Sequence, residues 1–218
     1  MIILYLFIAA VLGYVFGSIN FAVIFAKAFG NVDVRDVGSG NAGATNAMRV
    51  SKKAGALTFV FDALKGFFAA GSGLLVMNLL ANGAFNNLGA IIGGLFCMIG
   101  HCWPVFFEFR GGKGVATCVG IFAICCPVAI IIGLAVFAIT LAISKMVSLG
   151  SLLATTTVVA ITLYWVWTHL LANISLIEPL AVSVIVVSMG AMVFIKHSEN
   201  IKRLIKGEER RFTLKKEK

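Results

Sequence analysis

Long apolar runs are the feature that most restricts what this chain can fold into. Several of them reach about 20 residues, the length that an α-helix needs to cross the hydrocarbon core of a bilayer. Only 12% of the residues are charged, whereas soluble domains carry roughly 25% charged residues. The sequence therefore predicts an all-α fold, a polytopic membrane helical bundle.

The positions of the basic residues predict how this bundle is oriented. Seventeen of the eighteen Lys and Arg residues fall within residues 27–53, 110–113, 145 and 196–218. Basic loops of membrane proteins lie mainly in the cytoplasm. Nucleic-acid binding could also produce a basic tail, but topology explains most of the net charge of +9, and no nucleic-acid partner is expected. We expect about seven transmembrane helices, with the N-terminus outside and the C-terminus cytoplasmic. They form a single domain over residues 1–218, with a basic tail from about residue 196.

The predicted spans follow the apolar runs and the turns between them. They cover residues 2–26, 55–80, 85–100, 115–143, 146–167 and 178–195. Pro127 breaks the fourth run, because proline ends or kinks a helix, and basic residues on both sides of that run require an even number of crossings. Each arm then has roughly 14 residues, about 21 Å of helix, against a core of ~30 Å. Two short spans and a re-entrant hairpin both satisfy this pattern.

Two charged residues, Asp62 and Lys65, fall inside the second predicted span. Their spacing of i, i+3 places them on one helical face, where they can pair. Charges inside a span are costly and face the protein interior or a water-filled cavity. A structural ion pair and a role beside a ligand are both open at this point. The G-S-I-N stretch at residues 17–20 suits either a polar lining or close helix packing.

A hydrophilic stretch, G-S-G-N-A-G-A-T-N, follows the first span at residues 38–46, with Arg49 close behind it. Its glycines let backbone N–H groups approach an anion without obstruction by Cβ atoms. Ser39 and Asn41 add neutral hydrogen-bond donors, and the guanidinium of Arg49 suits a phosphate. The alternative is a flexible loop that only connects two helices.

Two further hydrophilic stretches lie at the predicted cytoplasmic ends of other spans. Residues 101–117 contain G-G-K-G, in which Lys113 is surrounded by glycine N–H groups that suit a phosphate. A Walker loop requires Ser or Thr after the lysine, and Gly114 stands there, so nucleotide hydrolysis is not indicated. The third stretch follows the last span and places His197 and Asn200 one helical turn apart.

Together these stretches resemble the acyl-phosphate–glycerol-3-phosphate acyltransferase family of bacterial membrane enzymes. The resemblance covers nearly the whole chain and rests on seven ordered motifs: G-S-I-N from residue 17, G-S-G-N-A-G-A-T-N-x-x-R from 38, F-D-x-x-K-G from 61, G-H-x-x-P-V-F from 100, G-G-K-G-V-A-T from 111, S-L-G-S from 148 and H-x-x-N-I-x-R-L from 197, with Glu209 beyond them. It implies transfer of a fatty acyl group from acyl phosphate to the 1-hydroxyl of glycerol 3-phosphate, in the first acylation step of phospholipid synthesis. The products would be lysophosphatidic acid and phosphate. The implied location is the bacterial cytoplasmic (inner) membrane, with the active site facing the cytoplasm.

The resemblance also implies which residues form the site. The reaction centre would contain Ser39, Asn41, His197 and Asn200. The substrate phosphates would be bound by Gly40, Arg49, Gly111, Gly112, Lys113, Gly114 and Ser148. Supporting roles would fall to Asn46, His101 and Glu209. Acyl phosphate, glycerol 3-phosphate and membrane lipid are the expected partners; no cofactor, metal or obligate protein partner is expected.

The chemistry of a direct transfer also suits these residues. The sequence has no G-x-S-x-G elbow, and no cysteine lies in an activated setting. Acyl phosphate is already activated, so we expect the glycerol hydroxyl to attack it without an acyl-enzyme. The base would be a substrate phosphate or His197, with titration of the histidine near pH 6.5.

A membrane transporter for an organic phosphate anion is the alternative function, and a non-catalytic assembly protein is a third. Transporter folds carry internal repeats with polar sites near the bilayer midplane. This sequence shows no convincing repeat, and its polar stretches lie at one predicted membrane face. An assembly protein has no need for three such stretches. Acyl transfer is therefore favoured.

Overall fold

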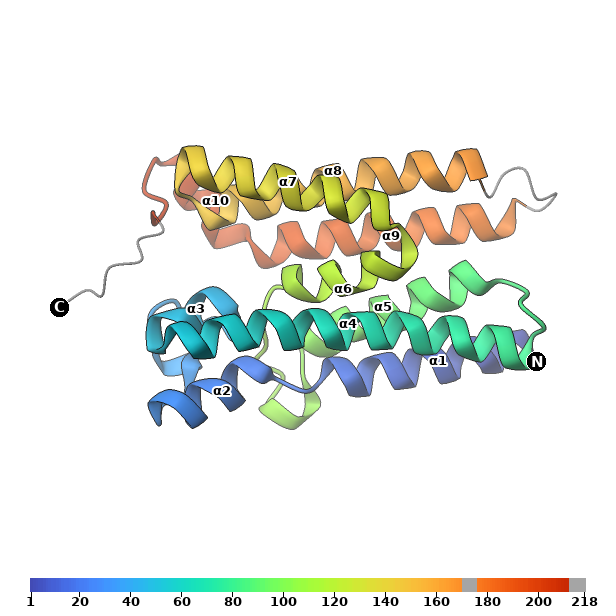
Figure 1. The fold of residues 1–218 in the computed structure, drawn as a ribbon, viewed down its shortest axis with the longest axis horizontal. Helices are drawn as coiled ribbons and strands as arrows, with labels where there is room; N and C mark the ends of the chain where they lie inside the picture. The colour runs from blue at the N-terminus through green and yellow to red at the C-terminus, as the bar shows by residue number, and fades with distance from the viewer. Residues whose placement is uncertain (170–175, 212–218) are drawn as a thin grey trace.

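The computed structural model describes residues 1–169 and 176–211, and all regular elements within these ranges are helices. They are α1 (Ile2–Gly17), α2 (Phe21–Gly30), the 3-10 helix η1 (Val34–Asp36), α3 (Ala44–Val50), α4 (Lys52–Leu80), α5 (Asn86–Cys102), the 3-10 helix η2 (Val105–Phe107), α6 (Val115–Cys125), α7 (Pro127–Ser144), α8 (Val147–His169), α9 (Ile177–Lys196) and α10 (Ser198–Ile205) (Figure 1). The all-α prediction is confirmed. The end of the basic tail, residues 212–218, lies outside the described residues.

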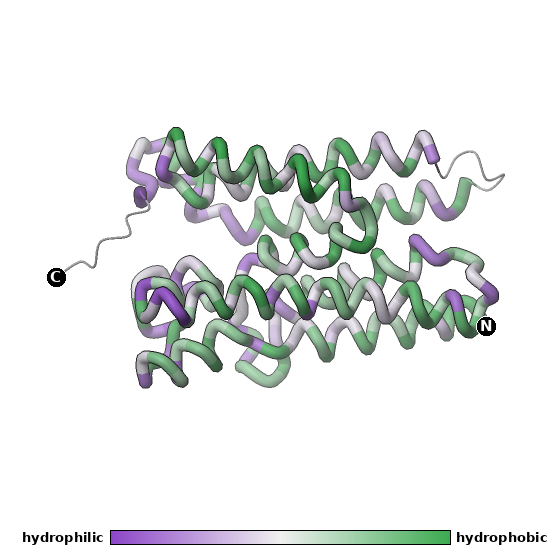
Figure 2. Tube along the Cα trace, viewed as in Figure 1, coloured by the Kyte–Doolittle hydropathy of each residue, from purple (hydrophilic) through white to green (hydrophobic). Residues whose placement is uncertain are grey.

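The long helices form two groups that lie along the same axis (Figure 1). α1, α4 and α5 pack against one another, and α7, α8 and α9 form the second group. The short helix α6 lies between the groups and contacts α4, α5 and α7, while α5 also contacts α9. Polar residues gather at the end of the bundle that carries α3 and α10 (Figure 2). The three hydrophilic stretches therefore lie toward one end of the molecule.

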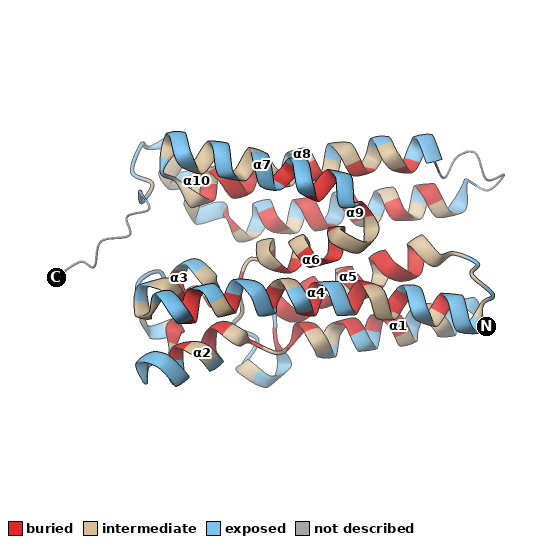
Figure 3. Ribbon diagram, in the orientation of Figure 1, coloured by how far each residue is buried: buried red, intermediate tan, exposed pale blue. Residues whose placement is uncertain are grey.

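Six helical segments are long and apolar enough to cross a membrane, and α6 is a shorter apolar helix. α1 and α2 together make the first of these segments, and α4, α5 with η2, α7, α8 and α9 make the others. With α6 added, this agrees with the expectation of about seven helices. Exposed positions lie on the outer sides of the long helices, and buried positions lie between neighbouring helices (Figure 3). Many of the exposed side chains are large and apolar.

The first span is broken, which corrects the prediction of one helix over residues 2–26. α1 ends at Gly17, and Asn20 begins α2 by accepting a hydrogen bond from the N–H of Val23 at 3.3 Å. A break inside a span leaves carbonyl groups without partners, and these need other donors. Nζ of Lys65 supplies one by donating to the carbonyl of Ile19 at 2.7 Å.

Close packing of α1 on α5 explains the glycine that precedes this break. A Cβ on Gly17 would lie 2.1 Å from the carbonyl oxygen of Cys97, so no other residue fits without a shift of the helices. Small residues allow helix backbones to approach in this way. Of the two alternatives for the G-S-I-N stretch, close helix packing is confirmed at Gly17. The capping role of Asn20 was not predicted.

The arms of the 115–143 run are unequal, and not about 14 residues each as expected. α6 has 11 residues and α7 has 18, with Pro127 as the first residue of α7. Proline suits that position because its missing N–H is not needed there. The turn between the arms lies short of the end at which α4 stops and α9 begins (Figure 1). Of the two arms, α7 is long and apolar enough to cross a membrane, and α6 is shorter than such a span.

Candidate active site

Glu209 is the centre of a hydrogen-bonded cluster beside α10. Its carboxylate accepts hydrogen bonds from the hydroxyl of Ser148 (2.9 Å), Nδ2 of Asn200 (2.7 Å) and Nε of Arg203 (3.0 Å). Burial raises the pKa of this carboxyl, but the three hydrogen bonds outweigh burial and hold the pKa of Glu209 below its ordinary value. The carboxylate is therefore charged at neutral pH. We refer to Lys113, Ser148, Asn200, Arg203 and Glu209 as the Glu209 cluster.

Lys113 joins this cluster from the loop before α6. Its Nζ donates a hydrogen bond to Oδ1 of Asn200, whose Nδ2 is bound to Glu209. Asn200 thus orients a cation on one side and an anion on the other. Burial lowers the pKa of Lys113 to about 8, against the opposing effect of Glu209. An ammonium has three N–H donors, so Lys113 keeps donors for a phosphate oxygen.

His197 lies between α9 and α10 and is 4% exposed. Its Nδ1 is 2.8 Å from the carbonyl oxygen of Val193. A carbonyl only accepts, so Nδ1 carries the hydrogen and Nε2 is left as the acceptor. Burial, followed by the positive charge of Lys113, lowers the pKa of His197 to about 4. The imidazole is neutral at neutral pH, and the expected titration near pH 6.5 is wrong.

The first hydrophilic stretch forms a loop that Asn46 holds in place. Asn46 is buried; its Nδ2 donates to the carbonyls of Val34 and Val37 at 2.8 Å each, and its Oδ1 accepts from the N–H of Ser39 at 3.2 Å. The Ser39 side chain and the side chain of Arg49 are exposed. The loop therefore presents Ser39 on a fixed backbone, and the last turn of α3 presents Arg49.

This loop and the glycine-rich loop meet at Gly112. A Cβ on Gly112 would lie 2.3 Å from Nε2 of His101 and 2.6 Å from the carbonyl oxygen of Ala42. The N–H of Gly112 also donates to the carbonyl of His101 at 3.1 Å. Only glycine fits between these two neighbours. The next glycine, Gly114, has a φ of +83° and begins α6, a conformation that glycine adopts without strain.

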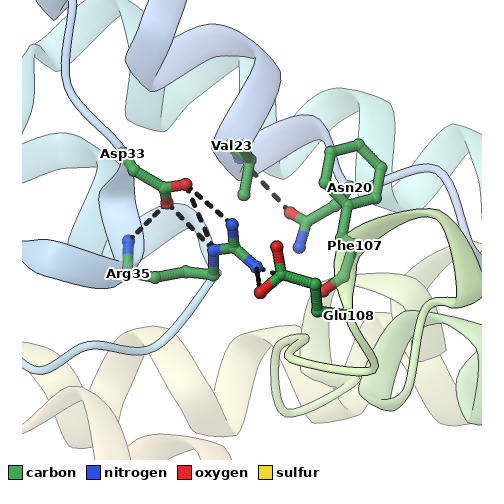
Figure 4. Close-up of polar contacts among 6 residues, drawn as sticks. All are labelled: Asn20, Val23, Asp33, Arg35, Phe107 and Glu108. Atoms are coloured by element: carbon green, nitrogen blue, oxygen red, sulfur yellow. Dashed lines mark hydrogen bonds and ion pairs between the residues drawn. The ribbon is translucent and has the colours of Figure 1, made fainter.

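Arg35 makes a second bridge between the same two regions (Figure 4). Its guanidinium pairs with Asp33 at 2.9 Å, donates to the carbonyl of Phe107 at 3.1 Å, and lies 3.7 Å from a carboxylate oxygen of Glu108. The hydrogen bond from Arg35 keeps the pKa of Asp33 below its ordinary value. Arg35 thus ties η1 to η2 and fixes the distance between the first and second hydrophilic stretches.

The predicted pairing of Asp62 and Lys65 is confirmed, with Nζ and Oδ1 2.8 Å apart. Nδ1 of His101 lies 3.6 Å from the same carboxylate oxygen. All three side chains are at most 5% exposed. His101 therefore faces a buried ion pair on one side and Gly112 on the other.

An apolar groove opens next to the Glu209 cluster. It has about 670 Å³ of empty volume, including space open to the surroundings, and lies among α4, α6, α7, α8 and α9. Val115 and Val193 line it near the polar residues, and Phe122, Ile130 and Met189 line it further along. Val115 is two residues after Lys113, and the carbonyl of Val193 holds the ring of His197. A ligand with a charged head and an apolar tail fits this combination.

Comparison with known proteins agrees with this arrangement. A family model described as glycerol-3-phosphate acyltransferase matches residues 7–207. The chain belongs to this family. The glycerol-3-phosphate acyltransferase of Thermoanaerobacter sp. (strain X514) is 39% identical over 208 residues, which cover 94% of this chain and 95% of the relative. Glycerol-3-phosphate acyltransferase 2 of Bacillus anthracis is 40% identical over 200 residues, 91% of this chain and 95% of the relative.

The fold of this family member also matches two crystal structures of PlsY (YgiH), an integral membrane glycerol 3-phosphate acyltransferase. The glycerol 3-phosphate form superposes with a TM-score of 0.78 at 35% identity, over 95% of this chain and 96% of that one. The lysophosphatidic acid form gives 0.74 at 33% identity, over 96% of each chain. Together with its apolar helices, this identifies the acyltransferase as an integral membrane protein.

The structure divides the predicted site residues of this acyltransferase into two groups. Lys113, Ser148, Asn200 and Glu209 are joined by hydrogen bonds, with His197 beside them. The second group belongs to the first hydrophilic stretch. Its members Ser39, Gly40 and Asn41 lie on the loop, and Asn46 and Arg49 lie on α3. Among the described residues no hydrogen bond joins the groups, and they meet where Gly112 lies against Ala42.

Two cations of the site, Arg203 and Arg35, are missing from the site residues predicted from the sequence. Arg203 stands inside the H-x-x-N-I-x-R-L motif, and that motif was the available signal. Arg35 belongs to no quoted motif, and its contacts with Phe107 and Glu108 span 72 and 73 positions. Only the fold shows them.

Proposed function

We propose that this acyltransferase moves a fatty acyl group from acyl phosphate to the 1-hydroxyl of glycerol 3-phosphate, releasing lysophosphatidic acid and phosphate. Family membership supports acyl transfer to glycerol 3-phosphate. The observation that carries the choice of donor is the position of Lys113, which lies in the Glu209 cluster and directly before the apolar groove. A single acyl phosphate molecule fits this arrangement, with its phosphate at Lys113 and its apolar chain in the groove.

Two phosphate groups need two sets of donors, and the two groups of residues supply them. Lys113 with the N–H groups of Gly111 and Gly114 forms one set, and Ser39, Asn41 and Arg49 form the other. The N–H groups of Gly112 and Gly40, two predicted phosphate-binding residues, are bound to the carbonyls of His101 and Val37. Arg35 and Gly112 hold these sets beside each other. The arrangement brings an acceptor hydroxyl and an activated carbonyl together in one site, and such placement lowers the barrier of a two-substrate reaction.

The reaction proposed at this site is a direct displacement. The 1-hydroxyl oxygen forms a bond to the acyl carbon, the bond from that carbon to the phosphate oxygen breaks, and the hydroxyl proton leaves to a base. Neutral donors from Ser39, Asn41 and the glycine loop would stabilise the developing oxyanion, and one such donor contributes about 10²–10³ in rate. All five cysteines are free thiols, and the scheme requires no chemical step from any of them, so no covalent intermediate is invoked.

The base is assigned to a substrate phosphate, with His197 in a positioning role. An efficient base has a pKa near the working pH. The pKa of His197 is lowered to about 4, while the second pKa of a phosphate monoester is about 6. The phosphate is the stronger base of the two. Neutral His197 still offers Nε2 as a hydrogen-bond acceptor for a substrate hydroxyl.

We place the protein in the bacterial cytoplasmic membrane with this site on the cytoplasmic side. The support is the distribution of basic residues. Lys145 follows the end of α7 and Lys196 ends α9, and these helix ends lie toward the same end of the bundle as α3 (Figure 1). Basic residues are enriched on the cytoplasmic side of membrane proteins.

A donor comparison tests the proposed function. Purified protein is incubated with radiolabelled glycerol 3-phosphate and one of three donors: palmitoyl phosphate, palmitoyl coenzyme A or palmitoyl acyl carrier protein. Labelled lysophosphatidic acid is expected from palmitoyl phosphate alone. Product formed at equal rate from palmitoyl coenzyme A would contradict the choice of donor.

A further inference from the structure

The buried charges of α4, Asp62 and Lys65, lie beside the break between α1 and α2 and beside the end of α5. Asp62 and Lys65 form an ion pair of 2.8 Å, with their side chains only 1% and 2% exposed. Nζ of Lys65 is also bound to the carbonyl of Ile19, in the break between α1 and α2. The pair is therefore anchored at both ends, to α4 itself and to the broken first span.

His101 connects this pair to the glycine-rich loop. Nδ1 of His101 lies 3.6 Å from Oδ1 of Asp62, and the opposite edge of the ring, at Nε2, lies against Gly112. The backbone carbonyl of His101 accepts a hydrogen bond from the N–H of Gly112 at 3.1 Å. Ring and backbone of one residue thus fix the position of Gly112, which directly precedes Lys113.

We propose that Asp62, Lys65 and His101 form a positioning unit for the phosphate-binding loop. The charge pair holds the imidazole, the imidazole and its carbonyl hold Gly112, and Gly112 sets where Lys113 meets a substrate phosphate. This inference rests on the proposed function, and it assigns a catalytic purpose to charges that do not touch substrate.

An ion pair with a purely structural role would not need His101 beside it. Lys65 compensates the charge of Asp62, and the carbonyl of Ile19 takes an ammonium hydrogen. Within the described part of the chain, neither carboxylate oxygen of Asp62 has a donor aligned for a hydrogen bond. The carboxylate of Asp62 is held by the charge of Lys65. Its second polar neighbour is His101, the residue whose ring and carbonyl contact Gly112.

The test removes both charges together, because removing one leaves the other buried and unpaired. Replacing a buried ion pair by uncharged side chains of similar size is often neutral or stabilising. The double variant Asp62→Asn/Lys65→Gln removes both charges, and its new amide at position 65 can still donate to the carbonyl of Ile19. It is therefore expected to insert, to purify as a single species and to melt near the wild-type temperature. Lys53→Gln, which removes an exposed cation of the same helix, is the matched control and is expected to keep wild-type kinetics.

A positioning role predicts a specific kinetic pattern. The substrate whose KM rises in Lys113→Ala is the one whose phosphate Lys113 binds. In the double variant the KM for this same substrate is expected to rise about tenfold. Adding Lys113→Ala to the double variant causes little further loss, because the pair acts through Lys113, and residues in one network are non-additive. His101→Asn, which keeps a donor near the position of Nδ1, retains more activity than His101→Ala.

Several outcomes would overturn the proposal. These are wild-type KM values in a folded double variant, losses that multiply independently with Lys113→Ala, or equal activity of His101→Asn and His101→Ala. A wild-type protein that makes no lysophosphatidic acid from acyl phosphate contradicts the proposed function instead, so the two failures are distinguished.

Discussion

Ser148, near the start of α8, donates a hydrogen bond of 2.9 Å to Glu209, which lies 61 residues further along the chain. The same carboxylate binds Asn200, and Asn200 binds Lys113. Three segments that are distant in the sequence are thereby joined through one anion. The position of Lys113 before the apolar groove depends on a residue that follows the last helix.

Substitution of Glu209 tests this dependence. A hydrogen bond to a charged group contributes about 1.5–3 kcal/mol, so Glu209→Ala is expected to lower kcat/KM by roughly one to two orders of magnitude. Ser148→Ala removes one of the three bonds and is expected to have a smaller effect. Glu199→Gln, on the exposed side of α10, is the control and should behave as wild type. Full kcat/KM in Glu209→Ala would exclude an organising role.

The lowered pKa of Lys113 predicts that activity falls at alkaline pH. Its pKa in the free enzyme is lowered to about 8, so the ammonium loses its proton as the pH rises above that value. The kcat/KM for its phosphate substrate is then expected to fall above about pH 8. Lys113→Arg should remove this alkaline limb, because a guanidinium stays charged. Lys113→Ala should lower activity roughly tenfold to hundredfold at all pH values. A limb that persists in Lys113→Arg would assign the titration to another group.

His197 is expected not to produce the acid limb of the reaction. With a pKa of about 4, it is already neutral throughout the range from pH 5.5 to 8. Wild type and His197→Gln should therefore show acid limbs of kcat at the same pH, although the variant is slower. Loss of the limb in His197→Gln would identify the histidine as the general base.

Topology is tested by cysteine labelling on a background without native cysteines. Single cysteines at Ser39, Ser144 and Ser198 should be protected from a membrane-impermeant thiol reagent in intact cells, and one at the exposed Asn82 should react. Permeabilised cells, in which all four react, give the control. Labelling at Ser144 from outside would contradict the even number of crossings between Lys113 and Lys145.

Local rules predicted much of this fold. The spans follow from the apolar runs, and the pairing of Asp62 with Lys65 follows from their i, i+3 spacing. The break after Gly17 was missed because Ser18 and Asn20 interrupt an apolar run only briefly. Its stability depends on Lys65, which reaches the carbonyl of Ile19 from another helix.

The site required tertiary information for its connections. The motifs identified Lys113, Asn200 and Glu209 separately, but not that Asn200 binds both of the others. The contact of Gly112 with His101 and Ala42 depends on how two loops fold over each other. The low pKa of His197 likewise follows from burial and from Lys113, and neither can be derived from the spacing of the motifs.

Steady-state kinetics with both substrates varied, combined with intact-mass measurement, tests the central claim most directly. Direct transfer between two substrates bound in one site predicts intersecting initial-velocity lines. It also predicts an unchanged protein mass after incubation with acyl phosphate alone. Parallel lines, or an added acyl mass on Ser39 or any cysteine, would contradict the account.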